Sequence, residues 1–161
     1  VADLQRRQKD IAQGVDERLR QFEPAKVTVD GLEFQADADE KRDFEAALAV
    51  FRGGKFADAK TAFAGFVRQY PRSGYVPSAR FWLGNAQYAA REYKEAIGNF
   101  KVLLSEAPGH ARAPEAALSI ANCQIELKET RTARKTLEDL LRDYPQSEAA
   151  VAAKERLSRL K

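Results

Sequence analysis

The sequence is poor in the residues that make disulfides, metal clusters and membrane spans. Its 161 residues include one cysteine, Cys123, and one histidine, His110. A single cysteine cannot close a disulfide within the chain, and together with one histidine it offers too few ligands for a zinc site. No apolar run approaches the about 18 to 20 residues that a membrane-spanning helix needs. We therefore expect no metal and no membrane insertion.

A large net charge is missing too. The 27 basic and 24 acidic residues interleave along the chain and leave a formal net charge of +3. A protein that binds nucleic acid usually concentrates its basic residues in one patch, so this mixture argues against a nucleic-acid partner. The opening residues, VADLQRRQKD, show no apolar stretch after a basic segment, so no signal peptide is visible in the sequence.

The motifs of common enzyme classes are also absent. The Gly53-Gly54 pair does not have the spacing of a dinucleotide-binding loop, and Trp82 has no phosphate-binding loop beside it. Acidic and basic residues alternate at helical spacing, and no carboxylate pair stands in an apolar context that would tune an acid and a base. We predict a protein that is not an enzyme, without catalytic residues and without a cofactor.

What the sequence contains instead is an internal repeat. Pro71, Pro108 and Pro145 lie 37 positions apart. The same step relates a small residue, an alanine and two large apolar residues in each unit: Ala47, Gly84 and Ala121; Ala59, Ala96 and Ala133; Phe63, Phe100 and Leu137; Phe66, Leu103 and Leu140. A period of this length is typical of proteins built from stacked helical hairpins.

Each unit predicts two helices, because its apolar residues fall in two blocks at helical spacing. The small residues let neighbouring helices approach closely, and the proline ends the second helix because it has no amide hydrogen. Ser73 and Ser147 can cap the helices that follow. We predict helices over 40–52, 56–69, 75–90, 93–106, 112–127, 130–143 and 147–160. The expected fold class is all-α: a tetratricopeptide-like right-handed superhelix of three helical hairpins plus a C-terminal capping helix.

The residues before 40 follow other patterns. Apolar residues at helical spacing form a thin stripe, which is typical of the end of a coiled coil or of an amphipathic helix that docks on the repeats: Leu4, Ile11, Val15, Leu19 and Phe22. Next, KVTVDGLEF alternates apolar and polar residues around Asp30-Gly31, a pattern that fits a short hairpin or an ordered linker. The predicted domains are 1–23, the end of a coiled-coil helix; 24–39, a linker or short hairpin; and 40–161, the repeat domain.

Four segments together resemble the YbgF family of Tol-Pal-associated periplasmic proteins, also called CpoB: LQRRQKDIAQGVDERLRQFE, VTVDGLEFQADADEKRDFEAAL, YPRSGYVPSARFWLGNAQYAAREYKEAIGNF and RDYPQSEAAVAAKERL. The repeats alone indicate only a tetratricopeptide-like protein. Their combination with the two preceding segments carries the resemblance, which extends over nearly the whole chain.

The resemblance implies an exported protein of the Gram-negative periplasm. Members have an N-terminal coiled coil that trimerises and a C-terminal repeat domain that binds TolA. The implied role is to help coordinate peptidoglycan synthesis with outer-membrane constriction during cell division. This sequence departs from the family in lacking a signal peptide and most of the coiled coil, so a homotrimer is expected only with the full coiled coil.

The predicted partner-binding residues belong to the first helix of each hairpin, which lines the concave side of a tetratricopeptide superhelix. Asn85 and Asn122 follow the small residue in two repeats, and an amide can pair with the backbone of a bound peptide. In the first repeat Leu48 takes that position. Apolar neighbours complete the set: Phe81, Tyr88, Leu118 and Ile125. Alternatively, the asparagines merely face solvent or cap a turn, and the apolar residues belong to the core.

A second hypothesis is a generic tetratricopeptide scaffold or co-chaperone in another compartment. Such a protein would need a basic clamp for a C-terminal carboxylate, and the candidates are Lys41, Arg42 and Arg80. These residues lack the paired pattern of such clamps. A third hypothesis, an enzyme that uses Cys123, is weakened because Cys123 shares its repeat position with Ala86, which indicates a small core residue.

Overall fold

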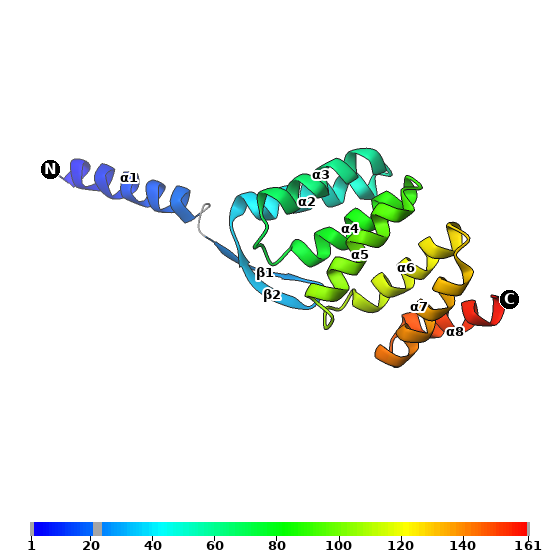
Figure 1. Ribbon diagram of the computed structural model, residues 1–161. Coiled ribbons are helices and arrows are strands. Elements are labelled where there is room, and N and C mark those ends of the chain that lie inside the picture. Colours follow the sequence, from blue (N-terminus) through cyan, green and yellow to red (C-terminus); the bar gives the residue numbers. More distant parts are fainter. Residues whose placement is uncertain (1, 21–23, 161) are drawn as a thin grey trace.

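The computed structural model describes residues 2–20 and 24–160, and within the first helix it describes side chains up to residue 15 (Figure 1). Phe22 lies outside the described residues, as do the side chains of Arg18 and Leu19. The elements are α1 (Ala2–Arg20), β1 (Ala25–Val29), β2 (Leu32–Ala36), α2 (Ala38–Arg52), α3 (Phe56–Gln69), α4 (Val76–Ala89), α5 (Tyr93–Glu106), α6 (Ala113–Glu126), α7 (Thr130–Asp143) and α8 (Glu148–Arg159).

Helices α2 to α8 form three successive hairpins, α2–α3, α4–α5 and α6–α7, followed by the single helix α8. All seven begin and end within two residues of the predicted ranges. Figure 1 shows them stacked in chain order, so that each hairpin packs on the next. The periodic sequence pattern therefore predicted both the number and the order of these helices.

The repeated small and large residues form the core between the helices. Ala59, Ala96 and Ala133 are fully buried. The large residues four positions later are fully buried as well: Phe63, Phe100 and Leu137. At Gly84, an added Cβ would lie 2.6 Å from the ring of Phe100, which is closer than real Cβ contacts. The expected close approach of neighbouring helices is therefore present.

The turn inside each hairpin has one conformation that recurs with the repeat. Gly54, Arg91 and Lys128 all have positive φ values, of 78°, 61° and 63°. The amide of the following residue donates to a carbonyl five residues earlier, as Glu92 does to Gln87 in the second repeat. This is the hydrogen bond of a Schellman-type helix end, where glycine is usual. Only the first repeat has glycine, so the sequence did not reveal the shared turn.

In each repeat, a polar side chain accepts a hydrogen bond from a backbone amide at the start of the next helix. Ser73 accepts a hydrogen bond from the amide of Tyr75, and Ser147 accepts one from the amide of Ala150. The equivalent position in the second repeat is His110, whose Nδ1 accepts from the amide of Arg112 at 3.0 Å. His110 is buried, and its Nε2 has no hydrogen-bond partner among the described residues.

The segment between α1 and α2 forms an antiparallel hairpin in which Val27 pairs with Phe34. Asp30 and Gly31 both have positive φ, as a two-residue type I′ turn requires. The hairpin packs on the first repeat: Val27 is buried there, and the ring of Phe34 lies edge-on to Tyr75 with centroids 4.8 Å apart. It is therefore an integral part of the repeat domain and more than a spacer before it.

Helix α1 extends away from the repeats beyond the hairpin (Figure 1). Three residues of its apolar stripe are exposed: Leu4 by 64%, Ile11 by 67% and Val15 by 47%. The described part of the stripe therefore does not dock on the repeats. Over residues 2–20 and 24–160, none of the helices has the length and apolar character that crossing a bilayer requires.

Two glycines in helices should respond in opposite ways to alanine. Gly84→Ala should lower the free energy of unfolding, because overpacking against the Phe100 ring costs about 1–3 kcal/mol. Gly98 lies in α5 with open space around it, so Gly98→Ala should raise stability by about 0.5–1 kcal/mol. Urea unfolding measures both, and a gain of stability in both variants would mean that the close approach at Gly84 is not constraining.

The buried His110 should make stability depend on pH. Burial lowers the pKa of His110 below its usual value of 6.5; the carboxylate of Asp30 opposes this shift, and Arg112 adds to it. As the pH falls through 6.5, the unfolded chain takes up a proton more readily than the folded chain, so stability is lost. His110→Asn keeps an acceptor for the Arg112 amide but does not titrate. Between about pH 7.5 and about pH 5.5, the variant should lose less unfolding free energy than the parent; parallel profiles would contradict this.

Candidate protein-binding face

The first helices of the three hairpins, α2, α4 and α6, together with α8 form one face that we call the inner face. Three hollows lie on it, and two of them, the C-terminal and the N-terminal hollow, are described first. The C-terminal hollow, of about 290 Å³, is lined by α4, α6 and α8. The N-terminal hollow, of about 430 Å³, is lined by α2, α4, the start of α6 and the tip of the β-hairpin. Both therefore combine residues that are far apart in the sequence.

The C-terminal hollow brings together three of the predicted partner-binding residues. Tyr88 of α4 meets Asn122 and Ile125 of α6 there. All three are half-buried, so each presents part of its side chain at the surface. The ring of Tyr88 packs edge-on against Tyr93, with centroids 5.4 Å apart, and burial raises the pKa of its hydroxyl. The hollow thus offers an amide and two apolar side chains to a partner.

Charged residues of α8 complete the C-terminal hollow. Arg156 and Arg159 line it opposite Glu126 of α6. Arg159 is held by Glu155 through a hydrogen bond of 2.7 Å. The capping helix therefore does more than cover the last repeat, because it supplies one wall of this hollow. The sequence predicted the helix but not this wall.

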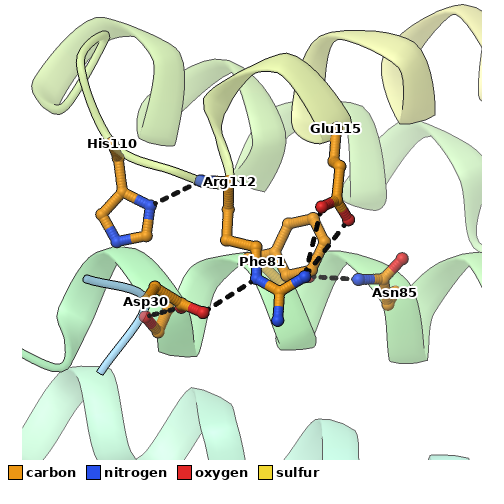
Figure 2. Close-up of polar contacts among 7 residues, drawn as sticks. Asp30, Phe81, Asn85, His110, Arg112 and Glu115 are labelled. Carbon is orange, nitrogen blue, oxygen red and sulfur yellow. Dashed lines mark hydrogen bonds and ion pairs between the residues drawn. The ribbon is translucent and has the colours of Figure 1, made fainter. Parts of the chain in front are cut away.

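The other three predicted residues do not join this group. Asn85 is half-buried, and its Nδ2 donates to the backbone oxygen of Phe81 at 3.1 Å, which leaves its Oδ1 for a partner (Figure 2). Phe81 is only 3% exposed and packs in the core, so direct contact between Phe81 and a partner is not supported. Leu118 is half-buried and lines a separate hollow with Pro114 and Ala149.

The tip of the β-hairpin reaches the inner face and is fixed there by Asp30. Its Oδ1 accepts a hydrogen bond from Nε of Arg112 at 3.0 Å, and its Oδ2 accepts one from the Ser78 hydroxyl at 2.5 Å. Arg112 lies 82 residues further along the chain. A turn residue of the hairpin is thus bonded to both the second and the third repeat.

Arg112 is the centre of this arrangement (Figure 2). Its guanidinium lies over the rings of Phe81 and Trp82, 5.1 Å and 5.3 Å from their centroids. Nη1 also donates to Glu115 at 3.2 Å. Such cation–π contacts hold a guanidinium flat on aromatic rings and orient its hydrogen bonds.

The sequence reasoning missed the residues of the N-terminal hollow. Trp82 is one of them: it packs against Phe51 and Phe81, is half-buried and lines the hollow. Its repeat position holds Glu45 and Ser119 in the other units, so a single aromatic residue among polar ones was a usable signal. No pattern indicated that Asp30 would meet Arg112.

The remaining candidates for charge recognition or chemistry have other surroundings. Arg42 pairs with Asp39 and Asp43 on the surface of α2, and Arg80 bonds to Asn99 of α5. Cys123 is fully buried, and burial raises the pKa of its thiol to about 12. In the part of the chain that the structure describes, no group of three or more metal-ligating side chains is present.

The sequence matches known proteins in two ways. The family described as YfiO, outer membrane lipoprotein, matches residues 36–161. A curated relative, the cell division coordinator CpoB of Escherichia coli (strain K12), is 40% identical over 47 residues. That match covers 29% of this chain and 18% of the relative, so it extends over a small part of the relative's length.

Solved structures share the fold. PcrH from Pseudomonas aeruginosa superposes with a TM-score of 0.67 at 14% identity, covering 78% of this chain and 93% of PcrH. The Yersinia enterocolitica type III secretion chaperone SycD, in complex with a peptide of the translocator YopD, gives 0.64 at 17% identity, covering 78% and 91%.

These similarities confirm the predicted fold class of tetratricopeptide-like helical hairpins. The family match spans the β-hairpin's last residue and all the repeats. The chain therefore belongs to the family described as YfiO, outer membrane lipoprotein, and its sequence fits a tetratricopeptide-repeat protein of the CpoB or YbgF type.

Proposed function

We propose that this protein is a periplasmic adaptor of the Tol-Pal system. In this role it binds TolA through its inner face and helps to coordinate peptidoglycan synthesis with outer-membrane constriction during cell division. The single observation that carries the proposal is the C-terminal hollow, where Tyr88, Asn122 and Ile125 meet beside Arg156. A hollow of this kind suits a partner protein, because it joins apolar contact area to a backbone-pairing amide and to charge.

The relatives support the choice of system. One family that matches is described as an outer membrane lipoprotein, and the curated relative is named a cell division coordinator. The first description supports a place in the cell envelope, and the second supports a role in cell division. SycD, with the same fold, is described in complex with a peptide, which favours recognition of an extended or helical segment over recognition of a small molecule.

The asparagines provide the test of this binding face. Asn85→Ala and Asn122→Ala together should leave the melting temperature nearly unchanged, since both side chains are partly exposed. Capture of purified TolA should fall about ten-fold, because several hydrogen bonds of about 0.5–1.5 kcal/mol each are lost. Asn122→Ala alone should account for most of the loss, because the Nδ2 of Asn85 is already bonded to Phe81. Biolayer interferometry with the full 161-residue chain measures the affinity.

The matched control lies on the second helices of the hairpins. Lys101 of α5 and Arg142 of α7 are exposed, and neither lines the inner-face hollows. Changing both to alanine should leave TolA capture unchanged. If this pair abolishes capture while the asparagine pair has no effect, TolA binds another face and the proposed site is wrong.

We also propose that α1 is the end of a coiled coil that becomes oligomeric only with its full heptad region. Its stripe of Leu4, Ile11 and Val15 is exposed, but Gln8 interrupts it. Isolated helices of this length are marginal in water, and a few heptads associate weakly. The 161-residue chain should therefore be monomeric in light scattering at low micromolar concentration. A tight trimer there would show that the stripe of α1 is sufficient.

A further inference from the structure

We infer that the N-terminal hollow is a second subsite of the inner face and that it binds an acidic segment of a partner protein in which an aspartate or glutamate stands next to an apolar residue. The inference rests on the proposed role of the inner face in binding a protein. It adds the chemistry of the partner segment and assigns a function to the β-hairpin, which forms one wall of the site.

The first argument is that the hollow contains arginine side chains whose hydrogen-bond donors are not all used. Arg52 of α2 lines it and is exposed, and no ion pair of the described residues includes this side chain. Arg112 lines the hollow as well. Its Nε bonds to Asp30 and its Nη1 to Glu115, whereas its Nη2 donates to no acceptor among the described residues. The hollow therefore holds two guanidinium groups with unused donors for an incoming carboxylate.

The second argument is that a side-chain carboxylate already binds on this face. Asp30 arrives on the hairpin tip, takes both a guanidinium and a hydroxyl as donors, and is largely buried with 13% of its side chain exposed. Stacking on Phe81 and Trp82 keeps Arg112 oriented for such a bond. An aspartate or glutamate of a partner would use the same chemistry on the unoccupied edge of that guanidinium.

The third argument is the apolar surface beside the charges. Leu48 and Trp82 are half-buried, and both line the hollow. Leu48 stands at the repeat position that Asn85 and Asn122 occupy further along the inner face. The first repeat thus replaces a backbone-pairing amide by an apolar contact, which suits a leucine or phenylalanine of the partner. Buried apolar area supplies affinity while the carboxylate supplies orientation.

Two acidic residues line the hollow: Asp30, which is already bonded to Arg112 and Ser78, and Glu45, which opposes an acidic ligand. Glu45 of α2 is exposed, two helical turns before Arg52 on the same helix. It repels a second carboxylate at that end, so the preferred segment has its acidic residue toward Arg52 and Arg112 and its apolar residue toward Leu48. Glu45→Gln should therefore tighten binding.

Trp82 provides the measurement, because it is the chain's only tryptophan and lines the hollow. The probes are three hexapeptides with blocked ends and without aromatic residues. In each, leucine alternates with one polar residue: aspartate, lysine or asparagine. When the aspartate peptide is titrated into the full chain, the Trp82 fluorescence emission should change and reach a plateau. The affinity of the peptide should be lower at high salt concentration. The lysine and asparagine peptides should bind at least about ten-fold more weakly, because a hydrogen bond to a charged group contributes about 1.5–3 kcal/mol.

Variants of the exposed Arg52 distinguish binding in the N-terminal hollow from a general effect of the protein's charge. Arg52→Gln should weaken the aspartate peptide about ten-fold, and Arg52→Glu should reverse the preference toward the lysine peptide. The matched control, Arg131→Gln in the first turn of α7, removes an exposed arginine outside the hollow and should change nothing. Circular dichroism checks that each variant keeps its helices.

Three outcomes would overturn the inference. They are an unchanged affinity in Arg52→Gln, an equal loss in Arg131→Gln, and tight binding of an asparagine peptide that carries a free C-terminal carboxylate, which would identify a chain terminus as the ligand. The proposed function is judged separately by TolA capture. If the aspartate peptide does not bind but TolA is captured in a way that depends on Asn122, only the proposed acidic subsite is wrong. If the peptide binds but TolA is not captured, only the proposed partner is wrong.

Discussion

This structure depends on one constraint, the close approach between successive helices. At the point of approach there is no room for a side chain larger than a methyl group. Ala47, Gly84 and Ala121 hold that position, and at Gly84 the ring of Phe100 occupies the space of a missing Cβ. Large side chains cannot be accommodated there without moving a packed aromatic ring. Because the spacing is set in the same way in each repeat, residues one repeat apart fall on the same face, and the inner face is built from equivalent positions of α2, α4 and α6.

The β-hairpin changes what that face offers. A plain stack of hairpins would leave the inner side of α2 and α4 open from end to end. Here Asp30 is bound by Arg112 and Ser78, so the hairpin tip forms one wall of the N-terminal hollow, whose chemistry differs from that of the C-terminal hollow. The C-terminal hollow presents an amide and apolar side chains, whereas the N-terminal hollow presents guanidinium groups beside an indole ring. A partner segment lying along the face would therefore meet two distinct subsites.

Local pattern was enough to predict the helices, the buried repeat positions and the burial of Cys123. It was also enough to gather Tyr88, Asn122 and Ile125 into one candidate site, because equivalent repeat positions must share a face. It left Phe81 open between the core and the groove, since the same helical spacing fits both, and the structure buries this side chain in the core. It also did not reveal that His110 stands at the helix-capping position that Ser73 and Ser147 hold in the other repeats.

The sequence by itself determined the repeat, the order and ends of seven helices and the small and large residues of the core, because each of these follows from spacing along the chain and from the chemistry of single residues. The tertiary structure alone decided where the hairpin tip lies and which charges remain free. Asp30 and Arg112 are 82 residues apart and share no pattern. Their contact depends on the combined geometry of a turn, a sheet and three stacked helices. Local sequence rules do not determine how these elements are placed relative to one another.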